Sequence, residues 1–160
     1  MIKAIGYIIL GIGIGIALTL RFTFCVSRNK DRRIKMFSEY FYSLDKWMKL
    51  LRKGCRLEDY LVANDKRIIA IYGIGIMGRQ LLQEFCGGKI IVKYVIDQNV
   101  DNKSYSFPVR NMEDELENVD LIVVTPSYDF KNIKAELEKK VSCKIISLYQ
   151  LIGDWYDDCE

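Results

Sequence analysis

The chain has 160 residues, 24 basic and 21 acidic side chains, a net charge of +3 and no histidine. This length holds one domain of ordinary size plus an appendage. Because histidine is absent, catalysis by an imidazole is excluded. Proton transfer near neutral pH would have to use Tyr, Lys, Cys or a carboxyl group with a shifted pKa.

Residues 1–27 are predicted to form a transmembrane helix. The stretch from Ala4 to Leu20 has no charged residue, and apolar residues resume after Arg21 and continue to Val26. A helix from Ile2 to Val26 would be about 37 Å long, which exceeds the ~30 Å of a hydrocarbon core. A cleaved signal peptide is disfavoured, because no A-x-A-like cleavage site follows the apolar stretch.

The charges beside this helix predict its orientation. Only the amino terminus and Lys3 precede the uncharged stretch, whereas five cations follow the helix closely: Arg28, Lys30, Arg32, Arg33 and Lys35. The positive-inside rule then predicts a single-pass protein of the inner (cytoplasmic) membrane, with its N-terminus outside and its globular part in the cytoplasm. Gly11 and Gly15 form a G-x-x-x-G pair, which fits a homodimer in the lipid bilayer and equally fits the ordinary use of glycine in membrane helices.

Residues 28–66 are predicted to be a basic juxtamembrane and amphipathic helical linker, next to anionic lipid. A helix over residues 36–53 would place one set of apolar side chains on a single face. This set is Phe37, Tyr40, Phe41, Leu44, Trp47, Met48 and Leu51. We prefer the interpretation that this face covers an edge of the next domain; the alternatives are pairing with another copy or contact with the membrane surface.

The strongest motif is a glycine-rich turn between an apolar run and a helical pattern. Ile68 to Tyr72 reads as a strand, and Gly73-Ile74-Gly75-Ile76-Met77-Gly78 follows it. A second strand then ends at Asp97, 19 positions after Gly78. This context is typical of a dinucleotide-binding unit. The first glycine would permit the turn, the second would let a pyrophosphate approach the backbone, and the third would let the helix lie close to the sheet.

Asp97 is expected to determine which dinucleotide binds. A carboxylate at the end of the second strand accepts hydrogen bonds from ribose hydroxyls, whereas it repels a 2′-phosphate. The sequence therefore favours NAD over NADP.

The alternation of apolar runs and helical patterns continues to the end of the chain. Strands are expected at 121–124 and 144–148, with a short extended piece at 107–109. Helices are expected at 112–118 and from residue 130 to 141. Apolar runs without polar alternation predict a parallel sheet that is covered on both faces, an α/β fold. The expected strand order is 3-2-1-4-5, with the minor edge strand included. The domain would occupy residues 67–153, followed by an acidic tail at 154–160.

Four segments carry a resemblance to a known group of domains: Tyr72-Gly73-Ile74-Gly75, Val95-Ile96-Asp97, Phe107-Pro108-Val109 and Val119 to Pro126. The region from Ile68 to Ile152 resembles the NAD(P)-binding Rossmann superfamily, in the short form that binds nucleotide-sugars in bacterial envelope sugar-modifying enzymes. The resemblance implies a half-size Rossmann-like sheet flanked by helices. It also implies the following ligand-binding residues: Gly73, Ile74, Gly75, Ile76, Met77, Gly78, Asp97, Thr125, Pro126 and Ser127. The alternative for Thr125 to Ser127 is a plain strand-to-helix turn, in which Ser127 or Asp129 caps the next helix.

These features predict a membrane-anchored cytoplasmic nucleotide-binding module, for NAD(H) or a nucleotide-sugar, that is accessory to cell-envelope polysaccharide synthesis. The alternatives are a small NAD-dependent oxidoreductase or sugar-nucleotide-modifying enzyme completed by a partner chain, and a scaffold that binds no nucleotide. Five widely spaced cysteines are expected to be free thiols, with no metal site. Nucleic acid is not an expected partner, because residues 68–160 carry ten basic and fifteen acidic side chains.

Overall fold

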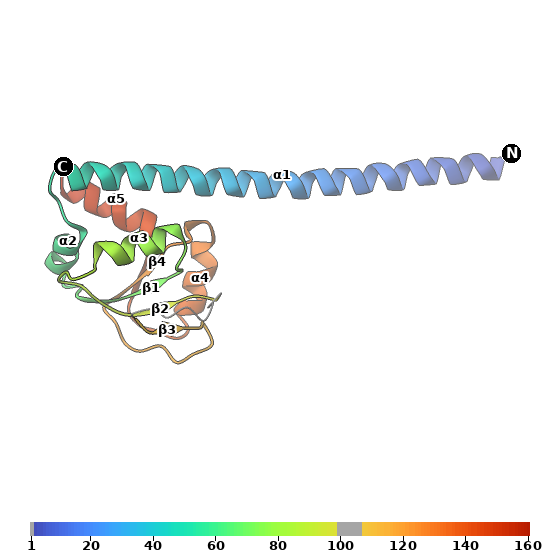
Figure 1. Ribbon diagram of the computed structural model, residues 1–160. Coiled ribbons are helices and arrows are strands. Elements are labelled where there is room, and N and C mark those ends of the chain that lie inside the picture. The colour runs from blue at the N-terminus through green and yellow to red at the C-terminus, as the bar shows by residue number, and fades with distance from the viewer. Residues whose placement is uncertain (1, 99–106) are drawn as a thin grey trace. The chain divides into compact units, whose positions relative to one another are not determined.

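The computed structural model describes residues 2–98 and 107–160 (Figure 1). The side chains of residues 2–10, 25, 26, 28, 29, 31 and 32 lie outside this description. The chain divides into two compact units, Met1–Phe37 and Ser38–Glu160. Each unit is therefore considered by itself.

A single helix, α1, extends over Ile2–Arg52 and includes both helices that the sequence predicts before residue 53. Within the described part of the chain, no helix combines the length and the apolar character that a bilayer crossing needs. The predicted membrane span includes residues 2–10, whose side chains are outside the description. The span and its orientation thus stay predictions.

Five parallel strands form the sheet of the second unit, in the order β3-β2-β1-β4-β5. The strands are β1 (Ile68–Tyr72), β2 (Ile91–Ile96), β3 (Val109–Arg110), β4 (Leu121–Val124) and β5 (Lys144–Ser147). The helices are α2 (Leu57–Ala63), α3 (Ile76–Glu84), the 3-10 turn η1 (Ser127–Asp129), α4 (Phe130–Leu137) and α5 (Leu148–Asp158). The predicted α/β class, parallel pairing and 3-2-1-4-5 order are confirmed.

Each face of the sheet has its own hydrophobic core. In β1, Ile69 and Ile71 belong to the core that includes α2, α3 and α5, whereas Ala70 and Tyr72 belong to the core that includes α4. Figure 1 shows α3 and α5 together above the strands. Because successive residues of a strand point to opposite faces, both sets are buried, which explains the apolar runs without polar alternation.

The last turns of α1 contribute to the first of these cores. Trp47 and Leu50 are buried there, and Tyr40 packs against the same cluster. The prediction that this helix covers an edge of the domain is confirmed for Tyr40 and Trp47. It does not hold for the whole predicted face, since Phe41 and Met48 are exposed.

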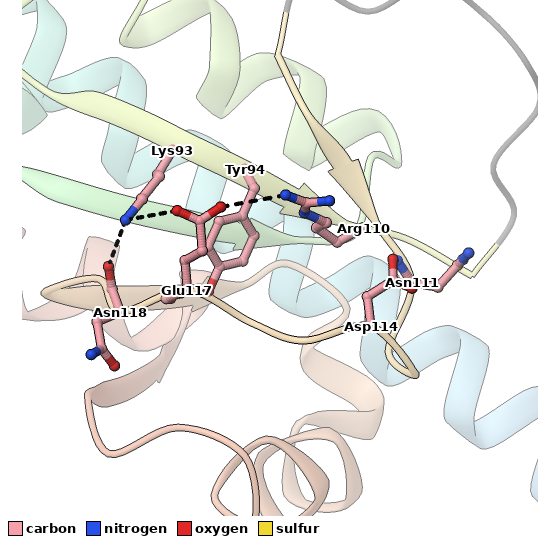
Figure 2. Close-up of polar contacts among 7 residues, drawn as sticks. All are labelled: Lys93, Tyr94, Arg110, Asn111, Asp114, Glu117 and Asn118. Atoms are coloured by element: carbon pink, nitrogen blue, oxygen red, sulfur yellow. Dashed lines mark hydrogen bonds and ion pairs between the residues drawn. The ribbon is translucent and has the colours of Figure 1, made fainter.

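The predicted helix at 112–118 is wrong, because these residues form turns and an extended segment. Figure 2 shows the contacts that hold them. The Glu117 carboxylate forms ion pairs with Lys93 at 3.0 Å and Arg110 at 3.3 Å, and its carbonyl accepts a hydrogen bond from the Tyr94 hydroxyl at 2.8 Å. These bonds to the sheet compete with helical ones. Glu113 and Glu117 would also repel each other one turn apart on a helix.

The C-terminal segment also differs from its prediction. The predicted acidic tail at 154–160 contains the last turns of α5, because Trp155 is fully buried in the first core.

Among the cysteines that the structure describes, four are free, as expected: Cys55, Cys86, Cys143 and Cys159.

Candidate functional site

The glycine-rich turn lies between the carboxyl end of β1 and the start of α3. Gly73 has φ +93°, a left-handed conformation that favours glycine, and its N–H donates to the carbonyl of Ile96 in β2 at 2.8 Å. A Cβ at Gly73 would lie 2.8 Å from the Thr125 hydroxyl oxygen and 3.1 Å from Pro126 Cδ. Both the backbone conformation and the close approach of the 125–126 segment therefore require glycine here.

Gly75 and Gly78 meet opposite surroundings. A Cβ at Gly78 would collide with the carbonyl oxygen of Gly73, so the first turn of α3 lies directly against the loop. A Cβ at Gly75 would meet open space within 4 Å. Gly75 is the N-cap of α3 and has no side chain with which to cap it. Because the first N–H groups of a helix lack intrahelical acceptors, this end of α3 can receive an anion.

Asp97 follows β2 and contacts the same loop. Its Oδ2 accepts a hydrogen bond from the Ile74 N–H at 2.6 Å. The carboxylate is thus positioned by the glycine turn, at the edge where the sequence predicts a ribose. Gln98, the next residue, donates from its side-chain amide to the Tyr72 hydroxyl at 3.4 Å.

Thr125, Pro126 and Ser127 come directly after β4, beside the glycine turn. The Thr125 hydroxyl is buried, and its one proton is shared between the carbonyl oxygens of Tyr72 and Gly73, each 3.1 Å from the hydroxyl oxygen. Ser127 starts η1. Asp129 is the N-cap of α4 without a side-chain cap bond. Thr125 therefore fixes the shape of the glycine turn.

These loops meet at the topological switch point of the sheet. β1 has β2 on one side and β4 on the other. After β1 the chain continues to β2 on one side of the sheet, and after β4 it continues to β5 on the opposite side. Open α/β sheets bind ligands in the crevice outside the carboxyl ends of two such strands. The structure brings Gly73, Asp97 and Thr125, which lie far apart in the sequence, to this one place.

Two further polar residues, Tyr72 and Arg79, lie beside the glycine turn; for Arg79 the sequence leaves a phosphate contact and exposure to solvent as alternatives, with the second preferred. Burial, followed by the negative charges of Glu136, Asp97 and Asp129, raises the pKa of the Tyr72 phenol. Arg79 is exposed, and its guanidinium donates to the carbonyl of Ile74 at 3.0 Å. Three carboxylates thus act on the Tyr72 phenol, and the Arg79 guanidinium is held against the loop.

Tyr72 could have been suspected from its position as the last residue of a strand before the motif. The carboxylates of α4 and its N-cap give no such signal, because only the folded chain places them near the crevice. A second tyrosine, Tyr128 in η1, is half exposed. The pKa of Tyr40 is raised mainly by burial, and Tyr128 contributes a smaller part of this rise.

A second group of charged residues lies around the edge strand β3 (Figure 2). A hollow of about 490 Å³ there is lined by Arg110, Asp114, Glu115, Leu116 and Glu117. Hydrogen bonding with Lys93 is the main cause that lowers the pKa of Glu117. The charged groups around β3 bond mainly to one another. We therefore infer that they hold residues 111–118 against the sheet. The described residues contain no group of three or more His, Cys, Asp or Glu side chains suited to a metal ion.

Comparisons with protein-family models, curated proteins and solved structures found no significant match. The assignment of the fold therefore rests on the five parallel strands, their order and the helices that flank them. The fold is Rossmann-like.

Proposed function

We propose that this chain is a nucleotide-binding module that takes NAD(H) or a nucleotide-sugar at the crevice between the carboxyl ends of β1 and β4. The observation that carries the proposal is the unequal space at the three glycines. Gly73 and Gly78 are closed by packing, whereas Gly75 faces open space at the start of α3. A loop that kept glycine only for its own packing would not need the second one.

The chemistry around the loop favours a ligand with one pyrophosphate and an unmodified ribose. The N–H groups at the start of α3 suit the pyrophosphate. Asp97, which lies against the glycine turn, suits ribose hydroxyls. A 2′-phosphate on that ribose would lie beside the Asp97 carboxylate and be repelled, so NAD(H) is favoured over NADP(H).

The same residues support binding more than catalysis. The chain has no histidine, and the Thr125 hydroxyl already donates to two carbonyl oxygens. Because the pKa of the Tyr72 phenol is raised, less of it is ionised at neutral pH to phenolate, the form that could accept a proton. We therefore propose a module that holds its ligand without transforming it.

The proposed cellular setting is the inner membrane, with the module in the cytoplasm. Support for the anchor comes from the uncharged stretch between Ala4 and Leu20 and the cations after it. Support for a role accessory to envelope polysaccharide synthesis comes from the resemblance to nucleotide-sugar-binding domains alone. Resistance of the full chain to carbonate extraction from membranes would test the anchor, and full release into the soluble fraction would refute it.

Ligand binding is tested best by thermal unfolding of the full chain with NAD, NADH, NADP and UDP-sugars. A ligand at 100 times its Kd should stabilise the protein by about 2.7 kcal/mol. An unchanged unfolding temperature with every compound would refute the proposal.

Asp97→Asn is the matched test of the acidic edge. The variant keeps one oxygen that can accept the Ile74 N–H, and it replaces the other, charged oxygen with a neutral amide group. We expect NAD to bind more weakly and NADP to bind relatively better, measured as the ratio of the two Kd values by calorimetry. An unchanged ratio would remove Asp97 from the ligand site.

A further inference from the structure

Within the second unit, the C-terminal end of α5 packs on the last turns of α1. Leu50 of α1 and Trp155 of α5 are fully buried in the same cluster. The ammonium groups of Lys46 and Lys53 lie 4.8 Å and 5.8 Å from the centre of the Tyr156 ring, within the range of a cation–π contact. Figure 1 shows α5 beside this end of α1. The two ends of the second unit's chain therefore meet at this junction.

The turn that ends α1 directs Cys55 toward the junction. Gly54 has φ +78°, and its N–H donates to the carbonyl of Leu51 at 3.0 Å. The N–H of Cys55 donates to the carbonyl of Leu50, also at 3.0 Å. These two bonds form a Schellman motif, in which the residue after the glycine commonly packs on the third residue from the helix end. Cys55 is accordingly packed against the cluster that contains Leu50.

Cys159 reaches the same place from α5. It is the C-cap of this helix and follows Trp155 by four residues, so both lie on one helix face. Cys159 is also partly buried against the first core. Burial is the largest cause that raises the pKa of Cys159, and a side-chain hydrogen bond to Cys55 is the next. Because a bond that raises the pKa favours the protonated form, the Cys159 thiol donates and the Cys55 sulfur accepts. The two sulfur atoms are thus in contact.

The other cysteines whose side chains the structure describes have different surroundings. Cys143 packs against the core on the opposite face of the sheet, and Cys86 is exposed after the end of α3. Within this described set, Cys55 and Cys159 are the two that are placed to react with each other. The proposed nucleotide site uses neither of them.

We propose that Cys55 and Cys159 form an oxidation site, at which hydrogen peroxide converts the two thiols into a disulfide. Both side chains are half-buried, so a small peroxide can reach them. The raised pKa keeps Cys159 as a thiol, and we assign the first attack to Cys55.

The reaction is balanced with one peroxide and two thiols. The Cys55 sulfur attacks a peroxide oxygen, the O–O bond breaks, and the other oxygen leaves as water with the thiol proton, which gives a sulfenic acid. The Cys159 sulfur then attacks the Cys55 sulfur. The S–O bond breaks, the S–S bond forms, and the hydroxyl group leaves as a second water with the Cys159 proton. The two sulfurs together lose two electrons, and the peroxide gains them.

The disulfide would close a loop that contains all five strands of the sheet, because β1 to β5 lie between residues 55 and 159. A crosslink restricts the unfolded chain more when it closes a longer loop. Oxidation should therefore stabilise the second unit and join the end of α1 covalently to α5. In a reducing compartment the two groups would remain thiols until peroxide appears. The proposal does not depend on the proposed ligand.

A variant that keeps only this pair gives the direct test. Cys25→Ser, Cys86→Ser and Cys143→Ser are combined in the full chain, which is treated in detergent with equimolar hydrogen peroxide and then with N-ethylmaleimide. Trypsin cleaves after Lys53, Arg56 and Lys144, so non-reducing mass spectrometry should find residues 54–56 linked to residues 145–160. We expect oxidation to raise the Tm by roughly 10 °C, and dithiothreitol to reverse both changes.

Cys159→Ser in the same background is the matched control. It should give neither the linked peptide nor the rise in Tm, and its unfolding without peroxide should show that it remains folded. Three results would each overturn the proposal. These are oxidation of both sulfurs to sulfinic acids without a link, a link that forms only between two chains on a non-reducing gel, and an unchanged Tm after complete linkage.

Discussion

Gly78→Ala should destabilise the protein, whereas Gly75→Ala should leave its stability unchanged. Both substitutions add one methyl group to the same short segment of six residues. At Gly78 the methyl group would collide with the Gly73 carbonyl oxygen, and that carbonyl is held by the Thr125 hydroxyl. At Gly75 it would enter open space.

The expected magnitude follows from the packing around each site. Overpacking typically costs about 1–3 kcal/mol, and alanine regains up to about 1 kcal/mol of helix propensity at Gly78. Because the obstacle at Gly78 is a hydrogen-bonded backbone atom that cannot rotate away, we expect a net loss of about 2 kcal/mol. Gly75→Ala should stay within about 0.5 kcal/mol, as for other open sites.

Thermal unfolding followed by circular dichroism measures the difference. A loss of about 2 kcal/mol lowers the Tm of a domain of this size by roughly 6–10 °C. Calorimetric titration with NAD provides the second measurement, since Gly75→Ala places a methyl group where the proposed pyrophosphate approaches the backbone. Equal Tm values for the two variants would refute the assignment of Gly78 to helix packing. An unchanged NAD affinity in Gly75→Ala would refute the proposed pyrophosphate position.

Two further predictions concern stability. Trp47→Ala should destabilise the second unit by about 3–5 kcal/mol, since this side chain is buried in the first core, whereas Met48→Ala, at an exposed position, should change the urea midpoint little. The pKa of Asp120 is lowered, because its carboxylate accepts hydrogen bonds from the N–H groups of Ile68 and Arg67. A lowered folded pKa adds stability above the unfolded pKa, and this stability is lost as the pH falls through the folded value. Asp120→Asn should therefore be less stable than the wild type at pH 7 and converge with it in acid, and a constant difference across a urea series at several pH values would contradict this.

The sequence was sufficient to predict the sheet because its signals there are local. The three central strands, β2, β1 and β4, are mostly apolar runs of four to six residues, and the glycine turn marks where β1 ends and α3 begins. The order of the strands follows from the resemblance to Rossmann domains. The position of Asp97 relative to the loop follows from the same pattern, although its bond to the Ile74 N–H does not.

The predictions that were wrong or incomplete depend on contacts between distant residues. The acidic segment at 112–118 has helical composition, but Lys93 and Tyr94 of β2 hold Glu117 in an extended conformation. In the helix before the domain, one apolar face was predicted where there are two adjacent ones. Only the folded chain separates Trp47, which packs inward, from Phe41, which does not. The partners of Thr125 were likewise outside the reach of the sequence.

The end of α1 and the glycine turn share one hydrophobic core. Trp47 and Leu50 from α1 belong to the same cluster as Ile74 and Met77 from the turn and α3. A substitution that loosens this core, such as Trp47→Ala, should therefore disturb the glycine turn as well as the end of α1.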